Sequence, residues 1–335
     1  MRRLTSERRI GLSNRGLLFS AGARVATAGA TLLVVAAIVF FVMRFVPGDP
    51  VLNWLGTSYE KADYDRLRAQ YGLDLPLMQQ FLIWFMHLFQ GNLGYSVLTQ
   101  LSVSDELLRR LPATLELILL SLAVALPLGI GSGIWAAWRY GKAADHVVLT
   151  ATLLGISLPE FFVGALLMLA LSLEWRLFPA TGFEPFAWSS EHFAHMALPA
   201  LALGLPRAAV ICRLMRGSLL EVFGRPYIRA SLAKGLSRRA TLFAHAVRNA
   251  LIPVVTVIGL QIGYLVAGAV VVERLFVIPG VGAYGLNAVT ARDYPSVQGF
   301  ILVVAAIFLI ANLIVDLLYL WLDPRIRIAA QGPVR

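Results

Sequence analysis

Few residues of this chain have the type and spacing that catalysis would require. Gly131-Ser132-Gly133 offers a serine nucleophile in an apolar stretch, but Ile130 stands where a protease motif of this kind needs glycine and no predicted span supplies a mid-membrane histidine base. His192 and His195 could share a metal ion, yet two histidines without a cysteine or a matched carboxylate make a weak site. We therefore expect an interfacial histidine pair, no catalytic residue and no metal site.

A nucleotide site is not expected either. The sequence contains three lysines, Lys61, Lys142 and Lys234. None completes the G-x-x-x-x-G-K-[ST] loop that cradles phosphates, because Gly141-Lys142 is followed by Ala143 and lacks the earlier glycine. If this chain takes part in a process driven by ATP, the ATPase is therefore another chain.

Polar side chains inside the apolar stretches are candidates for function, because such groups are costly in lipid. Glu160 and Arg207 lie in two such stretches, where a packing or interfacial role is favoured over contact with a substrate. Gln261 lies in a third, between Gly259 and Gly263. Glycines one helical turn apart allow close helix contact, either within this chain or against a partner subunit along a pathway.

The elements that must position these residues are membrane spans. With 58% hydrophobic and 14% charged residues, the chain is too apolar for a soluble domain. A span needs about 20 apolar residues. Six stretches qualify, at residues 25–46, 113–138, 147–173, 195–211, 251–272 and 300–322. Residues 76–90 are shorter and rich in aromatic side chains, which predicts a helix lying in the membrane interface.

The charges between the spans predict the side on which each loop lies. Residues 1–24 and 213–249 each carry many basic residues against one acid, and the tail 323–335 is also basic. By the positive-inside rule these segments, and so both termini, are cytoplasmic. The external loops are then 47–112, 174–193 and 273–298, and residues 113–322 form a core of five spans. The net charge of +10 follows this topology and not a single basic face, which argues against nucleic acid binding.

The basic segment between the fourth and fifth spans is the most distinctive part of the chain. Pro226 suits the first turn of a helix, Gly235 a left-handed stop, and Ser237 the cap of a second helix. That helix has an apolar stripe made of Leu236, Ala240, Phe243, Ala244 and Val247. Its opposite face carries Arg238, Arg239, Thr241, His245 and Arg248. Two short amphipathic helices joined at a glycine predict a surface element that a partner grips.

This segment resembles a known motif. The pattern R-A-S-x-x-x-G from Arg229 to Gly235 resembles the coupling loop of permease subunits in ATP-binding-cassette importers. Residues 227–263 are similar to the first permease subunit of the dipeptide, oligopeptide and nickel importers. The resemblance runs from residue 45 to residue 327 through the stretches VPGDP, VIPGVG, RDYPSVQG, NLIVDLLY and DPRIR. The general family pattern has Glu at position 229 and Pro at position 248, where this chain has arginine.

The resemblance implies an all-α integral membrane protein of the bacterial inner membrane, with six transmembrane helices and the type-1 importer permease fold. It also implies partners: a second similar permease, two ATPase subunits that bind ATP and magnesium, and an extracytoplasmic solute-binding protein. The loop residues that would couple to the ATPases are Tyr227, Arg229, Ala230, Ser231, Gly235, Leu236, Phe243 and Arg248.

The favoured function is a non-enzymatic half of the pathway for di- or oligopeptides, and other functions stay open. Nickel or another metal chelate would use the same architecture, and the short loop 174–193 is more typical of those members of the family. A secondary carrier would normally show inverted repeats and midplane charges, which are not clear in this sequence. A membrane protease would have to use Ser132.

Overall fold

The computed structural model describes residues 14–45, 49–55 and 59–322 of the chain. The predicted basic tail 323–335 and most of the predicted N-terminal segment 1–24 lie outside these residues. Every named element in the described ranges is a helix. Five helices are long and apolar enough to cross a membrane. They are α1 (Asn14–Phe45), α5 (Val103–Trp138), α8 (Ser190–Phe223), α11 (Val247–Phe276) and α13 (Tyr294–Leu322).

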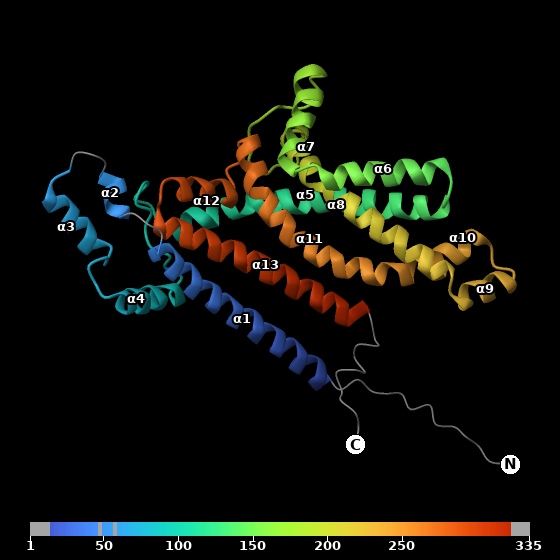
Figure 1. The fold of residues 1–335 in the computed structure, drawn as a ribbon, viewed down its shortest axis with the longest axis horizontal. Coiled ribbons are helices and arrows are strands. Elements are labelled where there is room, and N and C mark those ends of the chain that lie inside the picture. Colours follow the sequence, from blue (N-terminus) through green and yellow to red (C-terminus); the bar gives the residue numbers. More distant parts are fainter. Residues whose placement is uncertain (1–13, 46–48, 56–58, 323–335) are drawn as a thin grey trace, which may run out of the picture.

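The sixth candidate span is broken. The span predicted over residues 147–173 is not one straight helix, because α6 (Ala143–Ser157) is bent by 108° from the pair α7 (Glu160–Leu167) and η1 (Met168–Glu174). Proline disfavours the helical conformation of the residue before it, and Leu158 before Pro159 is extended, with ψ 131°. Figure 1 shows α7 crossing the direction of α6. The described residues therefore hold six candidate spans only if this bent pair counts as one.

The centre of the bundle is the contact between α5 and α8. A Cβ atom added at Gly129 would lie 2.8 Å from the carbonyl oxygen of Ala208, and one at Gly133 would lie 2.7 Å from that of Cys212. Small residues thus let the two helix backbones approach closely. The fourth span, predicted over 195–211, is the middle of α8, which passes through Pro199 and Pro206 without ending. Both prolines are buried.

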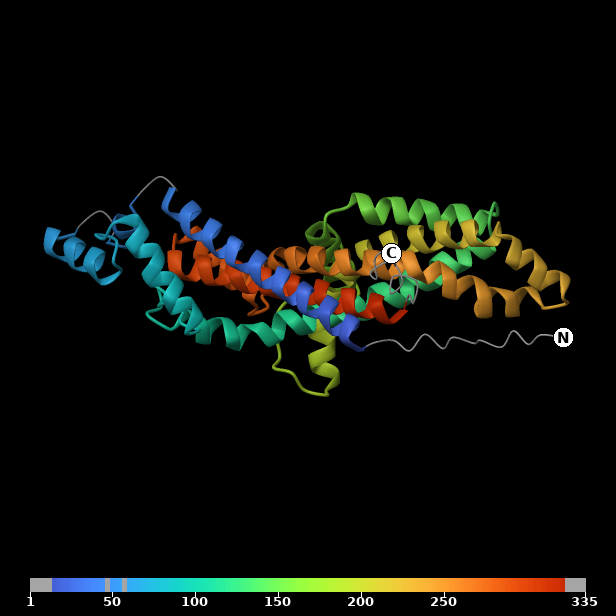
Figure 2. The same ribbon diagram turned by 90° about the horizontal axis from the view of Figure 1, so that it is seen from below.

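Two groups of short helices lie at opposite ends of the long axis of the molecule. At one end lie α2 (Pro50–Leu55) and α3 (Lys61–Gln70), with α4 (Leu77–Phe89) and α12 (Val281–Thr290) toward the same side. At the other end lie α9 (Pro226–Ala233) and α10 (Arg238–Thr241). Figure 1 shows α1 running alongside α13, Figure 2 shows the same pair from below, and the contact of the Arg44 guanidinium with the Tyr294 ring joins the last turn of α1 to the first turn of α13. With 13 residues α4 is a short apolar helix, and its place in the membrane interface stays a prediction.

The helix α12 is fixed to the bundle by a buried carboxylate. Glu273 at the end of α11 accepts hydrogen bonds from the Thr114 hydroxyl at 2.6 Å and from the Ala283 amide at 2.9 Å. Thr114 in turn accepts one from the amide of Val281 at 2.9 Å. A Cβ atom at Gly280 would overlap the Glu273 carboxylate, so this turn needs glycine. The stretch VIPGVG thus joins α5, α11 and α12.

Candidate functional site

The expected surface element is formed by α9, Gly235 and α10. Pro226 occupies the first turn of α9, Gly235 has φ +88°, and the Ser237 hydroxyl accepts a hydrogen bond from the Ala240 amide at 3.2 Å. These three sequence predictions are confirmed. A separate second helix is not found, because α10 continues through the π-helical segment η2 (Leu242–Ala246) into α11. The element is therefore directly joined to a membrane-spanning helix.

Buried apolar side chains anchor this element to the bundle. Ile228 of α9 and Leu242 of η2 are 3% and 4% exposed, and they belong to one cluster with Met215 and Leu219 of α8. Burial of such side chains stabilises the contact by about 1.5–3 kcal/mol each. A cavity of about 400 Å³ lies beside the cluster, between Trp138 at the end of α5 and Ile228, Leu232 and Leu242 of this element. The cluster thus packs α9 against α8 and against the segment that leads into α11.

The outer face of the element is apolar and basic. Phe243 is 63% exposed, and Tyr227 and Leu236 are also exposed. Thr241, expected on the polar face, is buried instead, because Leu242, Ala246 and Ala250 turn that side of the helix toward the core. Of the eight predicted coupling residues, one is half-buried, Ser231, and the other seven are exposed, Tyr227, Arg229, Ala230, Gly235, Leu236, Phe243 and Arg248.

A second site lies within the bundle, where three of the predicted pathway candidates meet. The Arg207 guanidinium of α8 pairs with the Glu160 carboxylate of α7. Arg207 Nη1 lies 3.5 Å from Gln261 Oε1 of α11, and the guanidinium carbon lies 5.3 Å from the centre of the Tyr264 ring. Arg207 Nε is buried and has no hydrogen-bond partner among the described residues. The group therefore links α7, α8 and α11.

The break in the third span places this ion pair. Glu160 is the first residue of α7, where the helix N-terminus favours a negative charge. Arg207 lies near the middle of α8 and Gln261 near the middle of α11. A cavity of about 270 Å³, lined by Ser157, Glu160, Arg207 and Val210 among others, opens at the break. The sequence marked these residues singly and gave no signal that they pair.

The two remaining pathway candidates pack inside the chain. A Cβ atom at Gly259 would lie 2.8 Å from Val315 Cγ1, and one at Gly263 would overlap the ring of Phe308. Both Val315 and Phe308 belong to α13. Of the two roles that the sequence left open for these glycines, the structure displays close packing within the chain. A role of Gly259 and Gly263 in the pathway stays a prediction.

The histidine pair does not converge on one point. His192 is buried, with Nε2 against the Glu116 carboxylate and Nδ1 2.9 Å from the Glu184 carbonyl oxygen. His195 Nδ1 lies 3.0 Å from a different group, the carbonyl oxygen of Glu191. Among the described residues no three His, Cys, Asp or Glu side chains gather as metal ligands would.

A further ion pair joins two residues that the sequence did not single out. Arg216 of α8 donates to both carboxylate oxygens of Asp145 in α6, at 2.6 and 2.8 Å, and Asp145 is 1% exposed. Gly141 adds a backbone hydrogen bond to the same carboxylate at 3.0 Å. The signal available in the sequence was a single acid, Asp145, close to the basic residues Arg139 and Lys142. This bidentate pair ties the start of α6 to the end of α8 that leads to α9.

Comparison with known proteins identifies the family. Residues 129–328 match the binding-protein-dependent transport system inner membrane component, and residues 22–118 match the N-terminal region of such membrane components. The dipeptide transport system permease protein DppB of Escherichia coli is 38% identical over 322 residues, covering 89% of this chain and 95% of the relative.

Two further relatives agree. The di/tripeptide transport system permease protein DppB of Pseudomonas aeruginosa is 40% identical over 318 residues, covering 88% of this chain and 94% of the relative. A probable peptide ABC transporter permease of Sinorhizobium fredii is 35% identical over 305 residues, covering 91% and 97%. Both the helical architecture and these matches span nearly the whole chain. The chain belongs to the family of binding-protein-dependent transport system inner membrane components, and it is a multi-pass membrane protein.

Proposed function

We propose that this chain forms one half of the translocation pathway of an ATP-driven importer of short peptides. The relatives whose names state a substrate are peptide, dipeptide or di/tripeptide permeases, which favours peptides over nickel or another metal chelate. The observation that carries the proposal is the exposed element of α9 and α10, anchored by Ile228 and Leu242 to the membrane helices. Such an element can receive force from a partner and pass it to the pathway.

The energy source in this proposal is a pair of separate ATPase subunits. The chain has no P-loop of its own, and ATP and magnesium would bind to those partners. The exposed aromatic and basic face around Tyr227, Arg229 and Phe243 is the surface on which an ATPase would dock. The chain is then not an enzyme by itself, and both of its termini face the cytoplasm with α9 and α10.

The group of Glu160, Arg207 and Gln261 is proposed to hold the moving helices in register. Its members come from α7, α8 and α11, and a buried charge that lost its partner would be costly in the membrane. The pair can therefore favour one arrangement of these helices and resist intermediate ones. A second permease and an extracytoplasmic binding protein would complete the pathway.

Reconstitution tests the proposal. Proteoliposomes would contain this chain, its partner permease and the ATPases, with the liganded binding protein outside and radiolabelled dialanine as cargo. We expect uptake only when ATP is inside, and none with the ATPases omitted. Uptake driven by a proton gradient without the ATPases would instead identify a secondary carrier. Transport of a nickel chelate but of no peptide would contradict the substrate assignment.

A further inference from the structure

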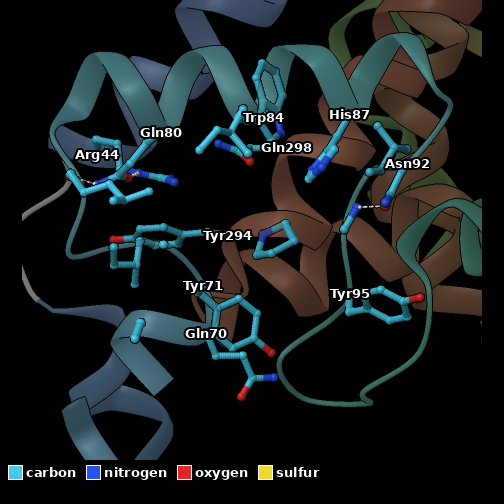
Figure 3. A pocket seen from close by; sticks show the side chains of 18 of the residues that line it. Arg44, Gln70, Tyr71, Gln80, Trp84, His87, Asn92, Tyr95, Tyr294 and Gln298 are labelled. Atoms are coloured by element: carbon cyan, nitrogen blue, oxygen red, sulfur yellow. Dashed lines mark hydrogen bonds between the residues drawn. The ribbon is translucent and has the colours of Figure 1, made fainter. Parts of the chain in front are cut away.

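A pocket of about 640 Å³ lies at the end of the molecule opposite α9 and α10. Its walls come from the end of α1, from α2, α3 and α4, from the loop before α5 and from the start of α13. This volume lies within the range of about 300–1,000 Å³ found for small-molecule sites. Figure 3 shows aromatic and amide side chains facing one another across it. None of the described residues that line it is an aspartate or a glutamate.

Three hydrogen-bond donors at the wall of this pocket lack an acceptor. They are Arg44 Nη1, Trp54 Nε1 and Gln298 Nε2, which are shielded from solvent and have no partner among the described residues. Gln298 is 3% exposed. Arginine and the tryptophan indole can only donate, so neither can become an acceptor for the other. Most buried donors in proteins do find an acceptor, so three unpaired donors around one hollow indicate a missing ligand rich in acceptors.

The arginine is held in place while its Nη1 has no acceptor among the described residues. Arg44 Nε donates to Gln80 Oε1 at 3.0 Å, and the guanidinium lies 4.6 Å from the centre of the Phe40 ring. The nearby Asp49 carboxylate is engaged instead by the Tyr64 hydroxyl at 2.5 Å. No ion pair is found between Arg44 and a carboxylate of the described residues. A positioned guanidinium edge matches the two oxygens of a carboxylate.

We propose that this pocket binds a short peptide by its terminal carboxylate, which Arg44 would pair with while Trp54 and Gln298 donate further hydrogen bonds. This inference rests on the proposed import of peptides. The amide of Gln70, which lines the pocket and can both donate and accept, suits a peptide backbone. Since no acidic side chain lines the pocket, the amino end of the peptide is not recognised by charge.

The geometry favours a small ligand over an acidic side chain of a docked protein. A docking surface would present its donors outward, whereas these three donors are shielded at the wall of a hollow. Aromatic rings from three elements, Tyr71, Trp84 and Tyr294, enclose the space and would pack on the side chains of a peptide. The Tyr71 hydroxyl is protonated at neutral pH and can donate a hydrogen bond, and burial raises its pKa further.

Equilibrium dialysis tests the pocket in the assembled transporter, in detergent, without ATP and without the binding protein. The probes are radiolabelled dialanine and the same peptide with its carboxyl end amidated. We expect dialanine to bind and the amide to bind about tenfold more weakly, a factor that corresponds to about 1.4 kcal/mol. Arg44→Gln and, separately, Gln298→Leu should weaken binding of dialanine by a similar factor. The control is Arg66→Gln, an exposed arginine of α3 outside the pocket, which should change nothing.

Several results would overturn this inference without touching the proposed function. They are absence of dialanine binding by the wild type, equal binding of acid and amide, and binding unchanged in both Arg44→Gln and Gln298→Leu. Binding of the unliganded binding protein to the transporter that is lost in Arg44→Gln would assign the pocket to an acidic side chain of that protein instead. If ATP-dependent uptake persists in each case, the import proposal stands and only this pocket is reassigned.

Discussion

Arg207 carries its charge near the middle of an apolar helix, where its carboxylate partner is Glu160. The side chains are 13% and 26% exposed, so the pair is mostly removed from solvent. A mostly buried pair of this kind adds little stability compared with apolar residues, but removal of one partner leaves a costly unpaired charge. At the scale of single residues, the pair therefore favours those arrangements of α7 and α8 that keep the two side chains in contact.

The first prediction concerns this pair. Glu160→Gln should lower the stability of the purified transporter by about 3 kcal/mol, because Arg207 would remain charged and lose its partner. The double change Glu160→Gln with Arg207→Gln should recover part of that loss, because no unpaired charge is left. Thermal unfolding in detergent measures both, and ATP-dependent uptake should fall in the single variant. Strictly additive effects would mean that the two side chains do not interact.

At the scale of elements, the segment around Gly235 combines an exposed face with a buried anchor. Gly235 has φ +88° and open space around it, so a side chain there would meet backbone strain and no steric clash. The strain of the left-handed conformation for other residues is about 1–2 kcal/mol. Gly235 thus sets the angle between α9 and α10, and it is not required for a packing contact.

The second prediction follows from that angle. Gly235→Ala should lower the population of the present conformation of this turn, relative to other conformations, by about tenfold, the factor that corresponds to the strain energy. ATP hydrolysis should continue while peptide uptake falls, and Gly235→Trp should show a stronger form of the same uncoupling. The matched control is Gly217→Ala in α8, an exposed helical position that also has open space around it. Normal uptake by Gly235→Trp would count against the coupling role.

The elements also show what the sequence could and could not predict. Local signals were sufficient for Pro226, Gly235 and Ser237, because a helix start, a left-handed turn and a cap depend on the nearest neighbours in the chain. Hydropathy over residues 147–173 could not show the bend of 108°, because an apolar composition is the same for a straight and a broken helix. The ion pairs of Arg207 with Glu160 and of Asp145 with Arg216 could not be predicted either, because each joins residues that are far apart in the sequence.

At the scale of the whole molecule, the two ends have different characters. One end carries the basic, exposed α9 and α10, and the other carries α2, α3 and the pocket beside Arg44. Between them the close contact of α5 with α8 and the link of Glu273 to α12 run along the bundle. If ATPases dock at one end and peptide is recognised at the other, the two ends must lie on opposite sides of the membrane.

The third prediction tests that orientation with the three lysines of the chain. Lys61 is exposed in α3 at one end, while Lys142 and Lys234 are exposed near the other end. A membrane-impermeant amine reagent applied outside right-side-out vesicles should modify Lys61 alone, as read by mass spectrometry of peptides. After permeabilisation Lys142 and Lys234 should react too, because the positive-inside rule places the short turn with Arg139 and Lys142 and the basic segment 213–249 in the cytoplasm. Since Lys61 and Lys234 report from the same molecule, modification of Lys234 but not Lys61 from outside would reverse the topology and remove the basis for ATPase docking at α9.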